Sequence, residues 1–320
     1  MGKSLVTGID IGHHSIKVVV LKLYKDTYEL VDHQELPVES DILSDNHKTN
    51  YQKIVKKLTE LRKRLPLFSH KVALAIPDNL IISKELQLDS TLNSEEVEYA
   101  IRQIFSQQTT LDGDKLAIDY IYIGEDSYNS SHLFRVFAAK KEDLLAPIDM
   151  VKKSGYQPIL MDVEGYCRAL ICHLVAQKFA REDWLLVDIG LNRISVCAFA
   201  SKKMPICVDF SIERFADNGD IEKRNAYLAE RVKVNLTTMD SLRDTAISFV
   251  WLAGGGALSQ GLEVALSLAL GLPCERFYPF GVFEKQPSSI LGKEHSQCIY
   301  ATAIGIALRG LAWMSDHDWN

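Results

Sequence analysis

The spacing of hydrophobic residues predicts a chain of short strands and amphipathic helices. Apolar runs rich in β-branched residues, at 5–12, 15–23 and 28–36, are separated by short turns, which favours an antiparallel meander. Residues 51–65 then carry apolar side chains at helical spacing, and residues 72–76 form a short apolar run that ends before a proline. The opening of the chain therefore predicts three strands, a helix and a fourth strand.

The pattern changes between residues 80 and 153. It predicts a strand, a helix capped by Asn93 or Ser94, two further strands, and a helix that stops at Gly155. The predicted ranges are 82–88, 94–108, 115–123, 132–139 and 141–153. Because strand-rich regions stand on both sides of this block, we interpret it as one inserted α/β subdomain.

The second half of the chain repeats the opening of the first. Asp188-Ile189-Gly190, between apolar runs at 184–190 and 194–200, matches Asp10-Ile11-Gly12. Such an internal echo predicts that the two halves are built alike. The other elements expected after the block are strands at 158–163 and 247–252 and helices at 164–179, 221–234, 239–245, 260–270 and 299–313.

Composition places the protein among ordinary globular chains. Of its 320 residues, 47% are hydrophobic and 24% charged, and the net charge of -6 gives no chain-wide attraction to nucleic acid or anionic lipid. The six cysteines form no C-x-x-C pair, and the N-terminus lacks the apolar stretch of a signal peptide. We therefore expect a cytoplasmic protein with free thiols.

The two Asp-Ile-Gly turns point to phosphate chemistry. A glycine at a strand end lets the backbone approach a polyphosphate closely, and a neighbouring aspartate can hold Mg²⁺ through water. One Asp-x-Gly is an ordinary turn, but two copies half a chain apart carry more weight. On this basis Asp10 and Gly12 are candidates in the first turn, and Asp188 and Gly190 in the second.

A glycine-rich turn stands third in order, at Gly254, Gly255, Gly256 and Ala257. Glycines between a strand and a helix permit close backbone approach to a flat or charged ligand, although the run read alone is a strand-to-helix turn. The ordered set of two phosphate turns and one adenosine turn resembles the signature of the actin, Hsp70 and sugar-kinase superfamily.

Within that superfamily the chain resembles the type IV pilus assembly protein PilM family over nearly its whole length, most clearly in residues 1–165. The matching stretches are Gly8 to Gly12 with Ser15 and Lys17, Ala73 to Asp78, Val163-Glu164, Gly254 to Ala257 with Gly261-Leu262, and Ala301 to Gly310. The resemblance implies an α/β, actin-like (ribonuclease H-like) fold of two lobes with an inserted 1C subdomain.

The resemblance also implies boundaries for each subdomain. These are 1A at 1–79 and 155–183, inserted 1C at 80–154, 2A at 184–200 and 247–298, a reduced 2B at 201–246, and a C-terminal helix at 299–320 that returns to 1A. Segment 209–244 is expected to lack the Gly-Gly-Asp and Glu-x-x-Lys features found in many relatives.

The resemblance further implies that the protein is a scaffold that binds ATP and Mg²⁺ and hydrolyses ATP weakly or not at all. It would sit at the cytoplasmic face of the inner membrane through partners, and bind the N-terminal cytoplasmic peptide of the membrane protein PilN beside 1C. Other pilus platform proteins are further possible partners, and the chain could self-associate. For the peptide surface Ile82, Leu86 and Leu88 are candidates, with a buried-core interpretation equally open.

The resemblance carries over a set of site residues. The expected nucleotide contacts are Asp10, Gly12, His13, His14, Ser15, Lys17, Asp188, Gly190, Asn192, Gly254, Gly255, Gly256 and Ala257, with Asp10 and Asp188 as Mg²⁺ ligands through water. Glu164 is read either as the residue that orients an attacking water or as a helix-start acid favoured by the helix dipole. Arg193 is read as a phosphate contact or as an exposed turn residue.

Two departures from the family are evident, because His13 and His14 replace small hydroxyl residues and the second turn is not threonine-rich. Two alternative functions stay open. A small-molecule (sugar-type) kinase would need a catalytic aspartate, for which Asp112, Asp114 and Asp119 are candidates without a supporting motif. A membrane-anchored, FtsA-like filament protein would need a basic amphipathic helix, whereas residues 312–320 are acidic and short.

Overall fold

The computed structural model describes residues 5–25, 27–38, 51–108, 113–126, 129–199, 205–213, 220–241, 246–287 and 294–317. The chain divides into two compact units, the first comprising 1–75 and 150–320 and the second comprising 76–149. Each unit is described separately.

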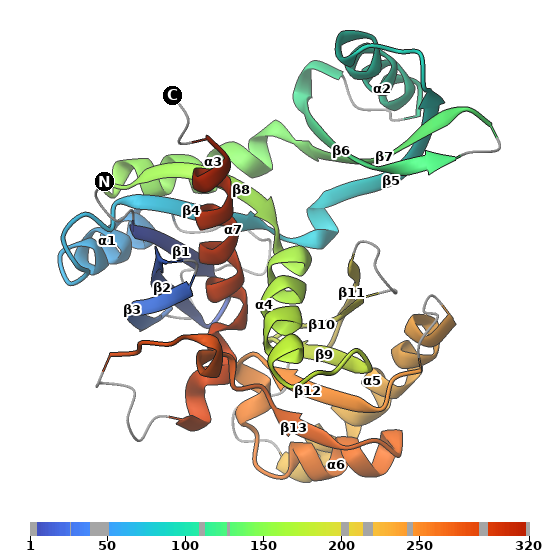
Figure 1. Ribbon diagram of the computed structural model, residues 1–320. Helices are drawn as coiled ribbons and strands as arrows, with labels where there is room; N and C mark the ends of the chain where they lie inside the picture. Colours follow the sequence, from blue (N-terminus) through green and yellow to red (C-terminus); the bar gives the residue numbers. More distant parts are fainter. Residues whose placement is uncertain are drawn as a thin grey trace. The chain divides into compact units, whose positions relative to one another are not determined.

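The first unit contains two five-stranded sheets of the same design (Figure 1). One has the order β3-β2-β1-β4-β8 and the other the order β11-β10-β9-β12-β13. The strands of the first sheet are β1 (Leu5–Ile11), β2 (Ser15–Tyr24), β3 (Thr27–Pro37), β4 (Lys71–Ile76) and β8 (Gln157–Val163). Those of the second are β9 (Trp184–Ile189), β10 (Arg193–Phe199), β11 (Pro205–Ser211), β12 (Phe249–Ala253) and β13 (Cys274–Arg276).

The two sheets also share their strand directions. β1, β2 and β3 run antiparallel in turn, and β4 pairs with β1 in parallel. β9, β10 and β11 likewise run antiparallel, and β12 pairs with β9 in parallel. The internal echo in the sequence is thus an echo in topology, and the predicted α/β, two-lobed actin-like fold is confirmed.

Two elements were missed by the sequence analysis. β11 forms an edge of the second sheet, so that sheet extends into the stretch assigned to subdomain 2B. β13 is the three-residue strand at the opposite edge. The predicted pair of helices at 221–234 and 239–245 is wrong, because α5 runs unbroken from Ile221 to Ser241.

Two long helices pack against each other between the sheets (Figure 1): α4 (Glu164–Lys178) and α7 (Ala301–His317). α7 lies on β1 and β2, whereas α4 contacts β9, β10 and β11. Small residues permit this approach, because a Cβ at Gly305 would collide with the backbone carbonyl of Cys167. The backbones of α4 and α7 can therefore approach each other closely at this point.

Residues 296–316 are long and apolar enough to cross a membrane. However, 78% of their most apolar window is buried inside the protein, as expected for a core helix. The remaining helices of the first unit are α1 (Tyr51–Arg62), with Ile54, Leu58 and Leu61 buried, and α6 (Leu262–Leu270), with a left-handed glycine at each end. Short 3-10 helices include η3 (Gly255–Leu258), η4 (Pro279–Val282) and η6 (Glu294–Tyr300).

The second unit has a three-stranded sheet of order β5-β7-β6, covered on one face by α2. Its elements are β5 (Ile81–Asp89), α2 (Ser94–Gln108), β6 (Leu116–Asp126), β7 (Ser131–Lys140) and the start of α3 (Lys141–Lys153). The side chain of Asn93 accepts bonds from the N–H groups of Glu95 and Glu96, and Glu96 accepts one in return from Asn93. This capping box explains why α2 begins where the sequence predicted.

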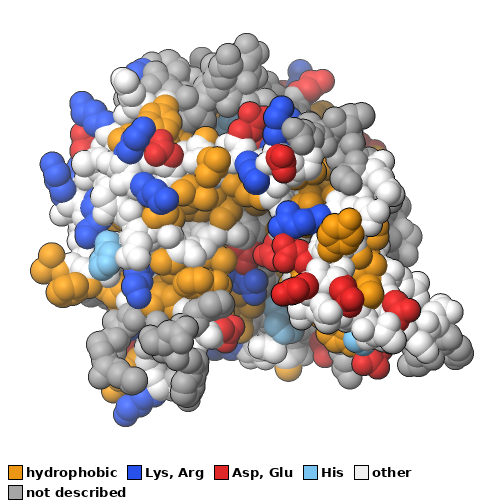
Figure 2. All heavy atoms as spheres, turned by 90° about the horizontal axis from the view of Figure 1, so that it is seen from above, with side chains coloured by type: hydrophobic (Ala, Val, Ile, Leu, Met, Phe, Trp, Pro, Cys, Tyr) orange, Lys and Arg blue, Asp and Glu red, His pale blue; other side chains and the backbone are white. Residues whose placement is uncertain are grey.

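Surface charge agrees with the composition. Basic and acidic side chains both occur on the face shown in Figure 2, with hydrophobic side chains between them.

Candidate functional site

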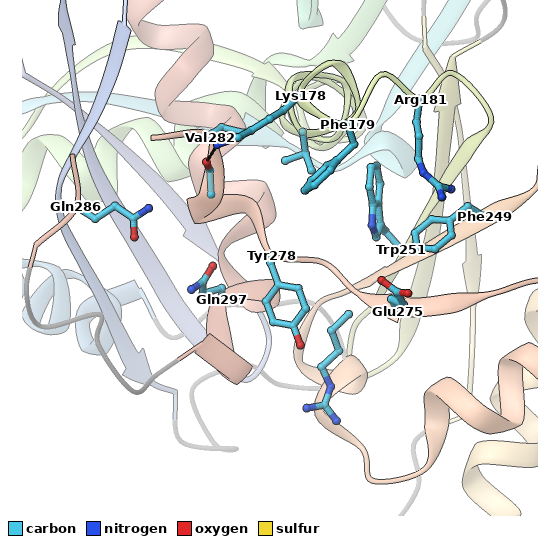
Figure 3. A pocket seen from close by; sticks show the side chains of 13 residues that line it. Lys178, Phe179, Arg181, Phe249, Trp251, Glu275, Tyr278, Val282, Gln286 and Gln297 are labelled. Atoms are coloured by element: carbon cyan, nitrogen blue, oxygen red, sulfur yellow. Dashed lines mark hydrogen bonds between the residues drawn. The ribbon is translucent and has the colours of Figure 1, made fainter. Parts of the chain in front are cut away.

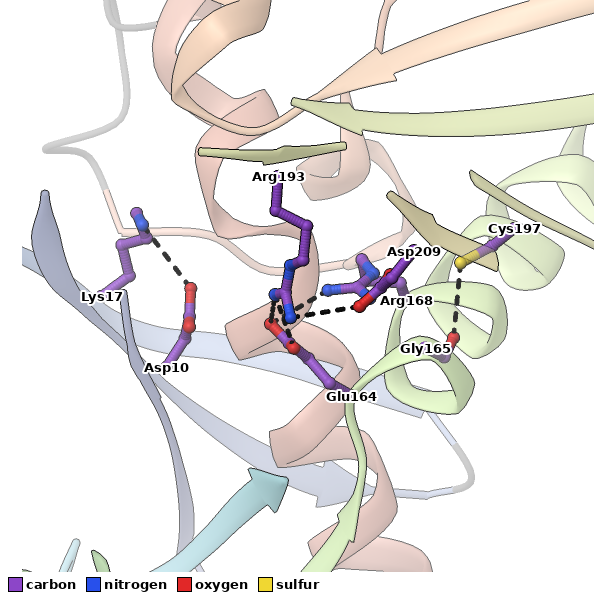
Figure 4. A network of polar contacts seen from close by, with 8 residues as sticks. All are labelled: Asp10, Lys17, Glu164, Gly165, Arg168, Arg193, Cys197 and Asp209. Carbon is purple, nitrogen blue, oxygen red and sulfur yellow. Dashed lines mark hydrogen bonds and ion pairs between the residues drawn. The ribbon is translucent and has the colours of Figure 1, made fainter. Parts of the chain in front are cut away.

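The first Asp-Ile-Gly turn joins β1 to β2. Asp10 lies opposite Lys17 in the sheet register, and the Lys17 Nζ is 3.6 Å from the Asp10 Oδ2 (Figure 4). The Gly12 N–H donates to the Ser15 carbonyl at 3.1 Å. The Ser15 hydroxyl is buried and donates to Glu35 at 2.6 Å, so it is directed toward β3.

The surroundings of Asp10 shift the pKa of its carboxyl group. Burial raises the pKa of Asp10 above its usual value, with Glu164 adding to the effect and Lys17 opposing it. Burial alone would lower the pKa of Lys17. The negative charges of Asp10 and Asp188 outweigh burial, so the pKa of Lys17 is raised. The lysine therefore stays charged, and a bound cation would favour the ionised form of the Asp10 carboxyl.

The second turn joins β9 to β10 with the same backbone pattern. The Gly190 N–H donates to the Arg193 carbonyl at 2.8 Å, and Asp188 lies opposite Ser195. Burial raises the pKa of Asp188, and the nearby carboxylates of Glu164 and Asp10 raise it further against the opposing effect of Arg168. Because Asp10 and Asp188 influence each other, the two turns face one region.

The glycine N–H groups in both turns are used within the turns themselves. A phosphate group would therefore meet the turn tips, where the exposed His13 and His14 stand in the first turn and Asn192 in the second. The Asn192 carbonyl accepts a bond from the Ile212 N–H at 3.0 Å, which holds this tip against the end of β11.

The glycine-rich turn packs directly on the second Asp-Ile-Gly turn. Gly254 has φ +80°, and a Cβ there would lie 2.5 Å from the Asp188 Oδ1 and 2.6 Å from the Ile189 carbonyl. A Cβ at Gly256 would collide with the Ile189 side chain, and the Ala257 side chain is buried. Only Gly255 is exposed, with no heavy atom within 4 Å of its virtual Cβ and no positive φ. Of the run, Gly255 alone is open toward a ligand.

A buried charge cluster lies where α4 begins (Figure 4). The two Glu164 carboxylate oxygens accept bonds from Arg193 at 2.9 and 2.7 Å, and Glu164 Oε1 also lies 3.0 Å from Arg168. Asp209 on β11 completes the cluster, 3.1 Å from Arg193 and 3.7 Å from Arg168. The cluster ties α4 to β10 and β11.

Burial disfavours the ionised form of Glu164, but Arg168 and Arg193 outweigh it and hold the pKa of that carboxyl below its usual value. Neither role expected for Glu164 includes these two arginines, and its role with water stays a prediction. Arg193 is not a freely exposed turn residue, because its guanidinium is committed to Glu164 and Asp209.

The proposed peptide-contact residues lie in the second unit. Leu88 and Leu86 belong to the core cluster under α2, so for them the buried interpretation holds, whereas Ile82 is 38% exposed. Of the kinase candidates, Asp114 and Asp119 are exposed in this unit, and Asp112 lies outside the described residues.

One expectation about α5 is wrong. Glu230-Arg231-Val232-Lys233 has the Glu-x-x-Lys spacing that the sequence analysis expected to be absent, and both charged ends are exposed on α5. The helix is anchored beside the glycine-rich turn, because Asn225 donates to the Gln260 carbonyl and accepts a bond from Ser259. Scanning for that spacing would have found the pair.

The residues present fit a Mg²⁺–polyphosphate group. Two partly buried carboxylates with raised pKa values face one region, Lys17 stands beside one of them, and Gly255 leaves open space. The described residues form no cluster of three or more His, Cys, Asp or Glu side chains able to hold a metal alone. This suits magnesium, which uses one or two carboxylates and takes its other ligands from water and phosphate.

Comparison with solved structures supports the fold. A structure described as a PilM–PilN type IV pilus biogenesis complex matches with a TM-score of 0.76 at 18% identity, covering 97% of this chain and 99% of that one. The ethanolamine utilization protein EutJ of Carboxydothermus hydrogenoformans matches with a TM-score of 0.53 at 14% identity, covering 96% and 90%. The cytoplasmic domain of EpsL, an inner-membrane component of the Vibrio cholerae type II secretion system, gives 0.50 at 10%, covering 97% and 95%.

No curated protein sequence matches the chain. The family model for type IV pilus assembly protein PilM matches residues 8–204, which is more than half of the chain. The chain therefore belongs to the type IV pilus assembly protein PilM family.

Proposed function

We propose that this protein is an ATP- and Mg²⁺-binding scaffold of type IV pilus assembly. The observation that carries the nucleotide part is the convergence of the three turns. The glycine-rich turn packs on Asp188, and Asp188 shares one electrostatic environment with Asp10 and Lys17. In this proposal Asp10 and Asp188 would hold Mg²⁺ through water and Lys17 would contact phosphate, and the metal would supply positive charge to the polyphosphate.

The commitment of Glu164 to two arginines supports a binding role with weak or absent hydrolysis. The two arginines hold the pKa of Glu164 below its usual value, which makes this carboxylate a weaker acceptor for the proton of an attacking water. The protein would thus act through the complex that it forms.

Calorimetric titration with Mg-ATP tests the nucleotide site. Asp10→Asn should weaken affinity on the order of 10–100-fold, the usual cost of disturbing a metal's supporting residues. Asp119→Asn removes the same charge from an exposed position in the second unit and should leave affinity unchanged. Equal affinities of the two variants for Mg-ATP would show that Asp10 does not belong to the nucleotide site.

For the partner, we propose the N-terminal cytoplasmic peptide of a PilN-type membrane protein, bound on the second unit, which would hold the scaffold at the inner membrane. Support comes from the family, from the similarity to a PilM–PilN complex, and from β5 and β6 being edge strands of a small sheet. Edge strands accept extended peptides through main-chain bonds, with side-chain pockets adding specificity.

Hydrogen exchange with the synthetic PilN peptide should protect amides within 76–149, and a scrambled peptide should not. Ile82→Asp should weaken binding, whereas Ile121→Asp is the matched control, since its similarly exposed side chain points to the opposite face of the same sheet. Protection confined to the second sheet of the first unit would refute this partner site.

A further inference from the structure

A pocket of about 590 Å³ opens on the second lobe, and none of the residues expected to contact the nucleotide lines it. Figure 3 shows it between the end of α4, the strands β12 and β13, and the 3-10 helices η4 and η6. Its volume falls within the range of small-molecule sites, roughly 300–1,000 Å³. The pocket is therefore large enough for a compact organic ligand.

Four of the described residues that line the pocket are aromatic. Phe249 and Trp251 are buried on β12, with ring centroids 5.5 Å apart, whereas Phe179 and Tyr278 stand exposed at the rim. The side chain of Phe179 is 63% exposed, so its ring is open to a ligand in the pocket. Rings at both the floor and the rim favour a flat aromatic ligand that stacks between them.

The side-chain amide of Gln297 supplies polar recognition in the pocket. Gln297 on η6 is only 7% exposed, and its side-chain amide points into the pocket with no hydrogen-bond partner among the described residues (Figure 3). A ligand with a hydrogen-bonding group would provide one.

Charge in the pocket is mainly positive. Arg181 lies with its guanidinium 4.4 Å from the Phe249 ring centroid and forms no ion pair within the described structure. The Lys178 ammonium donates to the Gly281 carbonyl, and Arg276 is paired with Glu263. Among the described residues that line the pocket, Glu275 is the only acidic one. An anionic group would therefore find Arg181 available and Lys178 close by.

We propose that this pocket binds a small planar aromatic anion, such as an aromatic carboxylate or sulfonate. The ring stacks between Phe179, Tyr278 and Trp251, the acid group pairs with Arg181, and the Gln297 amide fixes the ligand's orientation. This binding activity is independent of the nucleotide site and of the peptide partner. An aromatic side chain of a protein partner fits the rings but brings no negative charge to Arg181.

The probe is 8-anilinonaphthalene-1-sulfonate, a planar aromatic anion whose fluorescence rises when it leaves water. Titration of the full chain should give one saturable site. Arg181→Met should weaken binding about tenfold, the size of a lost charged hydrogen bond, and Gln297→Leu should weaken it about threefold. The neutral analogue N-phenyl-1-naphthylamine should bind at least tenfold more weakly than the sulfonate.

Control variants separate this pocket from generic hydrophobic binding. Phe68 is 77% exposed outside the pocket, so Phe68→Ala should leave dye affinity intact, whereas Phe179→Ala should lower it. Arg64→Met is the matched control for the arginine, and circular dichroism melts verify that each variant is folded. The proposal is overturned if Arg181→Met and Gln297→Leu bind the dye like the unmodified chain, if the neutral analogue binds equally, or if excess Mg-ATP displaces the dye.

Discussion

The turns at 10–12 and 188–190 hold corresponding residues at corresponding places in their sheets. Asp10 faces Lys17 across the first hairpin, and Asp188 faces Ser195 across the second, with the same separation along the chain. One strand further out, Glu35 pairs with Lys17 and Asp209 with Ser195. The backbone is repeated, but the row of side chains in the first sheet contains a cation and that in the second does not.

The missing cation in the second sheet is supplied from elsewhere. Arg193 occupies the turn position that Ser15 holds in the first sheet, and Arg168 approaches from α4. These two arginines hold Asp209 and Glu164, so they stabilise the junction of α4 with the second sheet. The comparison suggests that the first turn keeps its charge for a ligand, whereas the charges beside the second turn serve the fold.

Removing the most buried arginine should produce the largest effect. Arg168 is 1% exposed, and Arg168→Leu would leave Glu164 and Asp209 without one of their two cations. Breaking a buried ion pair costs about 3–5 kcal/mol of unfolding free energy, measurable by urea denaturation. Arg102→Leu, which breaks an exposed pair with Glu98, should cost less than about 0.5 kcal/mol. A cost below about 1 kcal/mol for Arg168→Leu would mean that the cluster does not hold the junction.

The glycine-rich turn should separate into structural and open positions. Gly254→Ala places a Cβ against Asp188 and Ile189 at a positive φ, and should cost about 2–4 kcal/mol. Gly255→Ala meets open space and should change stability by less than about 0.5 kcal/mol. Thermal melts of the two variants give the measurement. Equal melting temperatures would contradict the tight packing of Gly254 on the second turn.

Nucleotide affinity should distinguish the two rows of side chains. Lys17→Met removes a cation from the first row and should weaken Mg-ATP binding about tenfold, as expected for one charge-assisted hydrogen bond. Ser195→Ala alters the corresponding position in the second row and should leave affinity within about twofold. Calorimetric titration of both variants tests the difference. A larger loss for Ser195→Ala would reverse the roles assigned to the turns.

The smallest effects should appear in the pH dependence of stability, with opposite signs. The folded-state pKa of Glu164 is lowered, so its ionised form stabilises the fold above the unfolded-state pKa, near 4.5, and this contribution is lost as pH falls through the folded-state value. The folded-state pKa of Asp188 is raised, so its ionisation lowers stability as pH rises above the unfolded-state pKa, near 3.8, and the full cost is reached above the folded-state value.

Without nucleotide at pH 7, Glu164→Gln should therefore lower the melting temperature, and Asp188→Asn should raise it. The difference in melting temperature between each variant and the unmodified chain should shrink as pH falls. For Asp188→Asn it should vanish near about pH 4, and for Glu164→Gln at a still lower pH. Melts from pH 4 to 8 provide the measurement. A lower melting temperature for Asp188→Asn at pH 7 would show that the ionised carboxylate stabilises the fold, which would contradict the raised pKa of Asp188.

The sequence predicted most of the backbone because hydrophobic periodicity and the internal echo are local signals. It missed β13, which has three residues and no periodicity to detect. It could not assign Leu86 and Leu88 to a core, because alternation along β5 does not reveal which face α2 covers. It could not tell which glycine of the 254–256 run takes a positive φ, because the run contains no signal that separates Gly254 from its neighbours.

The sequence could not predict the charge cluster, because its members are distant from one another along the chain. Its four members come from α4, β10 and β11, and only the folded topology brings Arg168, Arg193 and Asp209 to Glu164. Each arginine read alone resembles an ordinary surface residue. Pairings between distant elements of this kind require the tertiary structure.

The contact between β1 and α7 has a consequence for how the protein is made. A Cβ at Gly8 would collide with the backbone of Ala303, so the first strand and the last helix are fitted against each other. These elements stand at opposite ends of the described chain, and loop closure over such a separation is slow. During synthesis the apolar face of the first sheet that α7 covers would stay exposed until α7 has left the ribosome. The first lobe, although translated first, would be completed last, and a chain arrested before α7 would be a natural substrate for chaperones.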